Sequence, residues 1–232
     1  NTQIITNGIL TAGNAGGGQY ELFVHVGDSV GRLLRIQSRV DDNGANPVTL
    51  VKNGVGQLEL GGTTANTYTG GTIINQGVVE IQTIGAFGGG SVLVPDPDFL
   101  TLNNGTVRVP SPTSGIRNIN FEVNRGVIVG PLGGSFALNP NVVVNIQSPI
   151  TGQGELVMGG VGGVGGRLVL QGNNTFEGGI RVEFGTLEIA GGSNTFKAPI
   201  TMNGGSLLVT NGASLPALAE IVINTGSFSI QD

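Results

Sequence analysis

Cysteine and tryptophan are absent from this chain of 232 residues, and histidine occurs once. The lack of cysteine excludes disulfides and thiolate-bound metals, and it suits either the cytosol or an exported chain that crosses a membrane unfolded. No apolar run approaches the ~18–20 residues of a membrane-spanning helix. The first residues, NTQIITNGIL, also lack the basic and apolar regions of a signal peptide. We therefore expect no membrane insertion by this segment, which is mature, excised from a longer protein, or cytosolic.

Charged residues are also scarce. Ten lysines and arginines oppose fifteen aspartates and glutamates, which gives a net charge of -5. Nucleic-acid binding needs a positive surface that releases counterions, so nucleic acid is not expected as a partner. Three arginines, Arg32, Arg35 and Arg39, lie close together in a stretch rich in β-branched residues. We predict a strand here, with Arg35 and Arg39 exposed to solvent on one face.

Glycine is abundant, with 43 residues. The glycines separate short apolar runs, and hydrophobic residues still make up 38% of the chain. Burying that much apolar surface can offset the entropy lost on ordering the chain. We therefore expect a folded protein rather than a disordered one.

One segment of the chain is repeated. NTYTGGTIINQGVVEI, Asn66 to Ile81, returns as NTFEGGIRVEFGTLEI, Asn174 to Ile189, and as NTFKAPITMNGGSLLV, Asn194 to Val209. Its second half, usually Asn-x-Gly followed by alternating apolar positions, is commoner and occurs at residues 73–81, 100–109, 121–129, 200–209 and 221–230. Several of its glycines follow one another at intervals of about 20 residues, a period typical of a stacked repeat architecture.

Each half-unit predicts a strand, a tight turn and a second strand, because Asn and Gly accept a positive φ and the flanking residues alternate with a period of two. No sustained helical spacing is present, so long helices are not expected. A step of about 20 residues fits one coil of a parallel β-helix. The predicted fold is all-β, a single solenoid over residues 1–232 with about eleven coils. The longer step from Gly77 to Gly105 predicts an inserted loop that contains VPDPDF.

Stacked coils place equivalent residues above one another. Tyr68, Phe176 and Phe196, or at least the last two, are predicted to form an interior aromatic stack. Asn203 and Asn224 are predicted to form a ladder of side-chain amides. A platform for sugar rings is the alternative role for the aromatic residues.

The stretch LVKNGVGQLELGGTTANTYTGGTIINQGVVEI, Leu50 to Ile81, resembles the passenger-associated transport repeat of bacterial autotransporters. That repeat combines an apolar-Lys-x-Gly-x-Gly opening, a Leu-x-Leu, Asn-Thr-Tyr-x-Gly-Gly-Thr and a closing Gly-x-Leu. The matching residues are Lys52, Gly54, Gly56, Leu58, Leu60, Asn66, Thr67, Tyr68, Gly70, Gly71, Thr72 and Gly77.

A second segment, residues 150–189, is similar but lacks the lysine and contains an inserted GGVGGVGG at residues 159–166, which we interpret as a loop or tight turns. Residues 190–232 are expected to add further coils. The resemblance implies a right-handed β-helix exported to the surface of a Gram-negative cell. It also implies a passenger portion without its own membrane translocator, because no amphipathic membrane strands are recognisable at the C-terminus.

One local pattern resembles the sequence around a catalytic serine. In GDSVG, Gly27 to Gly31, the glycine spacing is that of a nucleophile elbow, in which a strand, a sharp turn and a helix follow one another. Here His25 precedes Ser29 on the same expected strand, whereas the base should follow later in the chain. We interpret the pattern as a turn.

Two carboxylate pairs imitate acid–base or calcium sites. Asp41 with Asp42, and Asp96 with Asp98, are residue types that cleave polysaccharides or bind calcium. The Gly-His-Gly and Arg-x-Lys patterns of polygalacturonases are missing, and turn residues surround the first pair. We therefore predict no catalytic, cofactor-binding or metal-binding residues, and regard the Asp96 to Asp98 loop as the best candidate for binding something.

Three functions remain open. The first is a non-catalytic extracellular passenger segment that serves as a stalk or adhesin scaffold and contacts a host-cell or matrix surface. The second is a structural subunit that assembles end to end with other copies, because a β-helix ends in unpaired strand edges. The third, a polysaccharide-active β-helix enzyme, rests on fold analogy alone.

Overall fold

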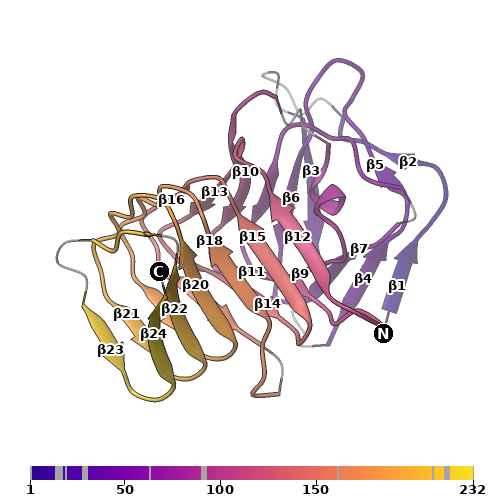
Figure 1. Ribbon diagram of the computed structural model, residues 1–232. Helices are drawn as coiled ribbons and strands as arrows, with labels where there is room; N and C mark the ends of the chain where they lie inside the picture. Colours follow the sequence, from indigo (N-terminus) through magenta and orange to yellow (C-terminus); the bar gives the residue numbers. More distant parts are fainter. Residues whose placement is uncertain are drawn as a thin grey trace.

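The chain forms a parallel β-helix, in which strands from successive coils lie side by side along one axis (Figure 1). The computed structural model describes residues 2–13, 18, 20–27, 31–62, 64–89, 93–160, 162–210, 212–216 and 220–231. Among these residues the only helix is the short 3₁₀ helix η1 (Ile84–Phe87). No helix in the described part of the chain has the length and hydrophobicity needed to cross a membrane. The all-β solenoid predicted from the sequence is confirmed.

Three long sheets and one short sheet form the sides of the solenoid. Sheet 1 contains β1 (Thr2–Ile5), β4 (Leu33–Ile36), β7 (Gln57–Leu60), β9 (Gly77–Ile81), β11 (Gly105–Val109), β14 (Gly134–Leu138), β17 (Leu156–Gly159), β19 (Ile180–Val182), β21 (Ile200–Met202) and β23 (Ile221–Ile223). Sheet 2 contains β3 (Glu21–His25), β6 (Thr49–Asn53), β8 (Thr72–Ile74), β10 (Asp96–Leu102), β13 (Arg125–Val129) and β16 (Ile150–Gly152). Sheet 3 contains β12 (Arg117–Phe121), β15 (Val142–Ile146), β18 (Arg167–Leu170), β20 (Thr186–Ala190), β22 (Ser206–Thr210) and β24 (Ser227–Gln231). Sheet 4 contains β2 (Ile9–Leu10) and β5 (Arg39–Val40).

A full coil passes from sheet 2 to sheet 1 and then to sheet 3, as β10, β11 and β12 do. The strands of successive coils pair in parallel. Sheets 2 and 3 each cover only part of the length. Sheet 2 ends at β16, and the later coils use sheets 1 and 3 alone. The early and late coils therefore differ in the number of strands that they contain.

The predicted number of coils was too high. The solenoid has about eight turns instead of the eleven expected, and its longest sheet has ten strands. The interval of about 20 residues that the repeat predicts separates Leu58 from its partner Val79 on the next strand of sheet 1. The step from Val79 to its next partner Val107, and the one from Val107 to Phe136, are each about a third longer. The length of a coil therefore varies along the solenoid, so the repeat interval alone does not give the number of coils.

The Asn-x-Gly pattern caused this error because it marks a corner between two strands, not a complete coil. Residues 73–81 join β8 of sheet 2 to β9 of sheet 1. Residues 121–129 join β12 of sheet 3 to β13 of sheet 2. Residues 200–209 join β21 of sheet 1 to β22 of sheet 3. The same local signal is thus used at all three corners of the coil.

The glycine spacing confirms this assignment. Gly105 lies beside Gly77 and Gly134 in sheet 1. It does not lie beside Gly126, which follows it at the interval of the repeat but belongs to sheet 2. An equal sequence interval therefore does not identify equivalent positions here.

Inward-facing side chains form columns that run along the axis. In sheet 3, Phe121, Ile146, Leu170, Ile189 and Val209 follow one another in register, and all are buried. Burial of each such side chain contributes about 1.5–3 kcal/mol relative to exposure. The hydrophobic effect therefore stabilises every coil through its neighbours, as expected for a stacked repeat.

The predicted aromatic stack is confirmed for two of its three members. The rings of Phe176 and Phe196 are stacked, with centroids 5.6 Å apart and an interplanar angle of 24°. Tyr68 is buried at another position, where its hydroxyl and that of Thr72 share a hydrogen bond of 2.7 Å. The sequence did not predict a second cluster, in which edge-to-face and tilted contacts join Phe87, Phe99, Phe121 and Phe136.

The predicted amide ladder is also present. The side-chain amide of Asn224 donates to the side-chain oxygen of Asn203 over 2.8 Å. Two further amide pairs of the same kind connect other coils, namely Asn75 to Asn53 and Asn145 to Asn120. Columns of equivalent polar residues thus satisfy one another's hydrogen bonds along the axis.

Candidate functional site

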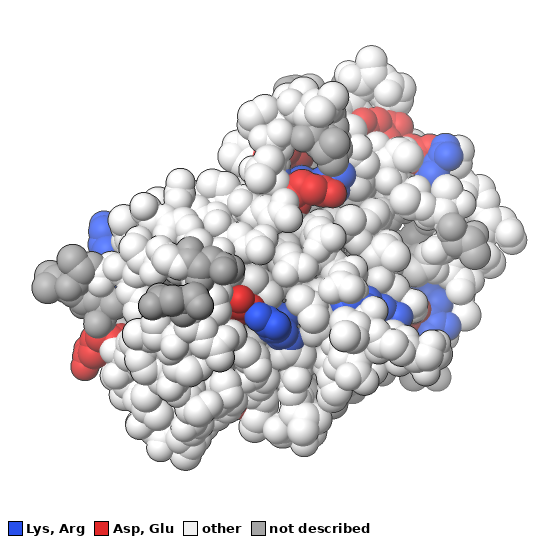
Figure 2. Space-filling model, viewed as in Figure 1, with Lys and Arg blue, Asp and Glu red and all other residues white. Residues whose placement is uncertain are grey.

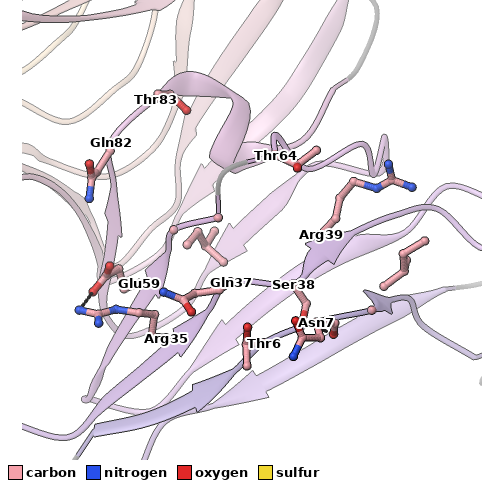
Figure 3. Close-up of a pocket in the computed structure, with 15 residues that line it drawn as sticks. Thr6, Asn7, Arg35, Gln37, Ser38, Arg39, Glu59, Thr64, Gln82 and Thr83 are labelled. Atoms are coloured by element: carbon pink, nitrogen blue, oxygen red, sulfur yellow. Dashed lines mark hydrogen bonds and ion pairs between the residues drawn. The ribbon is translucent and has the colours of Figure 1, made fainter.

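A cleft of about 920 Å³ opens at the corner where sheet 1 turns towards sheet 4 (Figure 3). It extends across the coils that contain β1, β4, β7 and β9, and residues of the turns after these strands line it. The uncharged polar residues that line it are Thr6, Asn7, Gln37, Ser38, Thr64, Gln82 and Thr83. Volumes of roughly 300–1,000 Å³ are usual for sites that bind small molecules.

Two glycines produce the hollow. Gln37, Gly61 and Gln82 each follow the last residue of a strand, and those strands, β4, β7 and β9, are paired in register. The three residues therefore form a column whose middle member has no side chain. A Cβ atom at Gly62 would lie 2.7 Å from the carbonyl oxygen of Gln37, so only glycine fits there. A Cβ atom at Gly61 would meet only the side-chain end of Glu59, at 3.0 Å.

The charged groups at the cleft are paired. The Arg35 guanidinium lies 2.7 Å from a carboxylate oxygen of Glu59, and this contact raises the pKa of Arg35. The Arg39 guanidinium binds the carboxylate of Asp41, which raises the pKa of Arg39 and lowers that of Asp41. On the face of the molecule in Figure 2, charged side chains are few and several basic groups lie beside acidic ones. The cleft therefore has little net charge.

The predicted single strand with Arg35 and Arg39 on one face was wrong. Arg35 lies on β4 of sheet 1, whereas Arg39 lies on β5 of sheet 4. The chain turns between them, and the hydroxyl of Ser38 fixes the corner by donating to the carbonyl oxygen of Asn7 over 2.8 Å. Arg32 is exposed and precedes β4.

The polar side chains of the cleft have hydrogen-bonding capacity to spare. Within the described ranges, the side chains of Gln37, Gln82 and Thr64 form no hydrogen bond with another residue, and the same is true of Thr6 and Asn7. All five are exposed. In Figure 3, Gln37, Gln82 and the Arg35–Glu59 pair stand around the same hollow, while Arg39 extends away from it.

Asp41 and Asp42 hold backbone turns in place. Asp41 accepts a hydrogen bond of 2.6 Å from the hydroxyl of Thr67. Asp42 accepts from the backbone nitrogens of Val48 and Thr69, each over 2.8 Å, and from the Thr69 hydroxyl over 2.7 Å. These carboxylates connect one coil to the next, and their oxygens are already occupied by protein donors.

Asp96 and Asp98 do not lie in the inserted loop that the sequence predicted. They begin the strand β10, which has a bulge between Asp96 and Leu100. Burial and a hydrogen bond with Asp98 raise the pKa of Asp96 to about 6, although the nearby Arg125 opposes this shift. The guanidinium of Arg125 lies 4.7 Å from the centre of the Phe99 ring.

Only part of the GDSVG segment, which resembles a nucleophile elbow, lies within the described residues. His25 is the exposed last residue of β3, and Ser29 lies outside the described residues. In the described part of the chain, no group of three His, Cys, Asp or Glu side chains could hold a metal ion. The repeated aromatic residues are not a sugar platform, because Phe176 and Phe196 are at most 2% exposed.

Lys52 occupies an unusual place for a lysine. It stands between Val24 and Ile74 in an inward column of sheet 2 and is fully buried. Burial lowers its pKa to about 8. Its ammonium group donates to the backbone oxygens of Asn53 over 2.9 Å, Gly54 over 2.6 Å and Gln76 over 3.1 Å. Lys52 thereby ties the turns of two successive coils together.

The repeated asparagine has one local role in both long copies. The side-chain oxygen of Asn66 accepts a hydrogen bond of 2.8 Å from the backbone nitrogen of Val40. That of Asn174 accepts one of 3.0 Å from the backbone nitrogen of Ile150. Both asparagines are buried, and each bonds to a strand of the preceding coil.

Two segments of the chain match the family model of the passenger-associated-transport-repeat, residues 50–81 and 165–189. These two segments are similar to passenger-associated transport repeats. The resemblance recognised in the sequence is thereby confirmed, and the repeat is a structural unit. The second match begins after the turn at Gly162 and Gly163, so residues 150–164 lie outside it. No curated protein and no solved structure matched the chain.

The cleft was not predicted from the sequence, although one signal was available. Gly61 and Gly62 follow the Leu-x-Leu of the first repeat at a point where the neighbouring coils carry glutamine. The consequence of this difference depends on which residues are stacked. That register became visible only in the structure.

Proposed function

We propose that this chain is a section of an autotransporter passenger domain that is exported to the surface of a Gram-negative bacterium. There it serves as an extended scaffold for adhesion and contains no catalytic residues. The observation that carries the proposal is that both transport repeats lie within one continuous β-helix. Transport repeats of this family imply secretion to the cell surface.

The architecture supports folding after export. Each coil packs mainly on its neighbours, so the solenoid can grow coil by coil as the chain emerges from a pore. The lack of cysteine supports the same conclusion, because no disulfide can form and lock the chain before it crosses the membrane. The buried asparagines of the repeats bond to the preceding coil and favour this ordered stacking.

A secretion assay tests the proposal. The chain is fused at its C-terminus to an autotransporter translocator, expressed in a Gram-negative cell and detected with antibody on intact cells. We expect surface labelling and a protease-resistant product, and a fusion with Phe176→Asp should lose both because its core cannot form. Labelling only after permeabilisation, with a known passenger exposed in parallel, contradicts the proposal.

End-to-end self-assembly is a second candidate, because strands of successive coils pair in parallel and a second copy can extend the same sheets. Phe228 and Ile230 on β24 continue the inward columns of Leu207 and Val209, so a stacked copy would pack on them. Light scattering after gel filtration should then show polymers that Ile230→Lys reduces to monomers. A monomer at all concentrations excludes this candidate.

A further inference from the structure

We propose that the corner cleft around Gly61 is a binding site for a neutral saccharide. The proposal gives the adhesive scaffold a ligand class and rests on that function only for its biological setting. Binding is measured on the purified chain, so it can fail or succeed independently of export.

The shape follows from an interrupted column of amides. At the corner formed by Asn203 and Asn224, amides on adjacent coils bond to each other. In the cleft, Gln37 and Gln82 occupy equivalent positions two coils apart, with Gly61 between them. Two inter-strand steps correspond to about 10 Å. Among the described residues the two amides form no hydrogen bond with each other, and each faces a gap that can hold a ligand.

The polar groups match the chemistry of a sugar. Amides and hydroxyls both donate and accept hydrogen bonds, as sugar hydroxyls do. Gln37, Gln82 and Thr64 provide such groups from three successive coils, and none of them is engaged by another described residue. Ile9 at the wall is 59% exposed and offers an apolar surface for the C–H face of a sugar ring.

The charges favour a neutral ligand over an anionic one. Arg35 is neutralised by Glu59, and Arg39 by Asp41. An acidic sugar would have to compete with Glu59 for the guanidinium of Arg35, and the carboxylate would repel it. A neutral oligosaccharide binds without breaking either ion pair.

Gly61 permits a direct test because its site tolerates a side chain. Its φ lies outside the left-handed region, and an added Cβ meets only the movable end of Glu59. Gly61→Gln completes the amide column and fills the hollow without disturbing the backbone. The matched control is Gly159→Gln, because a Cβ added at Gly159 meets nothing within 4 Å and the position lies in the same sheet, away from the cleft.

The experiment uses the purified chain and an immobilised panel of neutral oligosaccharides, with sialylated and sulfated sugars as the acidic arm. The best neutral sugar is then measured by saturation-transfer NMR and calorimetry. We expect a dissociation constant below about 1 mM, at least tenfold weaker binding by Gly61→Gln and by Gln82→Ala, and unchanged binding by Gly159→Gln. Circular dichroism of each variant confirms that the β-helix is intact.

Three results overturn the proposal. They are no binding of any neutral sugar, equal binding by the wild type and a folded Gly61→Gln variant, and a preference of the wild type for acidic sugars. If Gly61→Gln fails to fold, Gln37→Ala and Gln82→Ala decide the question, since both shorten exposed side chains and leave the backbone unchanged.

Discussion

The two transport repeats share a sequence pattern but lie on different sides of the β-helix. In the first, Thr72 to Ile81 form β8 of sheet 2 and β9 of sheet 1. In the second, the aligned residues form β19 of sheet 1 and β20 of sheet 3. The second copy is therefore shifted by one corner of the coil.

This difference shows which property the repeat specifies. A buried asparagine, a buried aromatic ring and a glycine turn recur in both copies, and they fix how the chain bends between two strands. They do not fix which side of the solenoid these strands occupy. That choice depends on the length of the preceding coils, which is not constant. The step from Thr2 to its partner Leu33 is about half as long again as the step from Ile180 to its partner Ile200.

The largest effect is expected from a charge in the aromatic core of the second repeat. Phe176→Asp removes a ring that is stacked on Phe196 and buries a carboxylate without a partner. The loss should exceed about 3–5 kcal/mol and abolish cooperative unfolding. Circular dichroism during thermal melting measures it. Phe184→Asp, at a position that is 38% exposed, is the matched control and should melt near the wild type.

The second prediction tests whether the buried asparagine has the same role in both repeats. Asn66→Ala and Asn174→Ala each leave the buried backbone nitrogen of a neighbouring strand without its acceptor. Each should cost about 1–3 kcal/mol in urea unfolding, with equal costs within the error of the method. Asn203→Ala, on the exposed ladder, should cost less than about 0.5 kcal/mol. A large effect for only one buried asparagine would show that the two corners are not equivalent.

The third prediction concerns a difference between the repeats, since only the first has the buried lysine. Lys52→Met keeps the shape of the side chain but leaves three backbone oxygens without their donor, so it should cost about 1–3 kcal/mol at pH 7.

The pH dependence of Lys52 has a definite sign. Its pKa is about 8 in the folded chain and 10.5 ordinarily, so between these values the unfolded chain binds more protons. The wild type should therefore gain stability through this group as the pH rises from 8 to 10. Lys52→Met should lack that gain, so urea midpoints of the two proteins should diverge over this range. Parallel curves would show that Lys52 does not titrate as described.

The smallest effect is expected at Asp96, outside both repeats. Its pKa of about 6 is above the ordinary 3.8, so the stability that its proton contributes is complete below pH 3.8 and is lost as the pH rises through 6. Because the group is partly solvated, Asp96→Asn should stabilise the chain by only up to about 1 kcal/mol at pH 7 and by nothing at pH 3.5. Melting temperatures at the two pH values measure this, and equal shifts at both would contradict it.

The fold class could be predicted from the sequence, whereas the number of coils could not. Strand, turn and strand are encoded locally by alternating apolar residues and glycine, so the β-helix, the Phe176–Phe196 stack and the Asn203–Asn224 ladder were predictable. The number of coils was not, because the local signal is the same at each corner and does not reveal how many strands a coil contains. Gly105 and Gly126 show this most clearly, because they are separated by the repeat interval but lie in different sheets.

The candidate site was even less accessible from the sequence. The cleft arises because Gly61 lies between Gln37 and Gln82 in space, while these residues belong to different coils and are far apart in the chain. Arg35 and Arg39 were expected to share a face, but a corner fixed by Ser38 separates them. Both features depend on long-range register, for which composition and periodicity carry no information.

Cysteine cross-linking tests the central claim, that the repeated pattern marks corners rather than full coils. The chain has no native cysteine, so pairs can be introduced cleanly. Thr106→Cys with Ser135→Cys places two thiols on paired neighbours of sheet 1, at a spacing that suits a disulfide. Thr106→Cys with Val127→Cys follows the interval between Gly105 and Gly126 instead. Mass spectrometry after mild oxidation should find the disulfide only in the first pair. A disulfide in the second pair, with none in the first, would contradict the account.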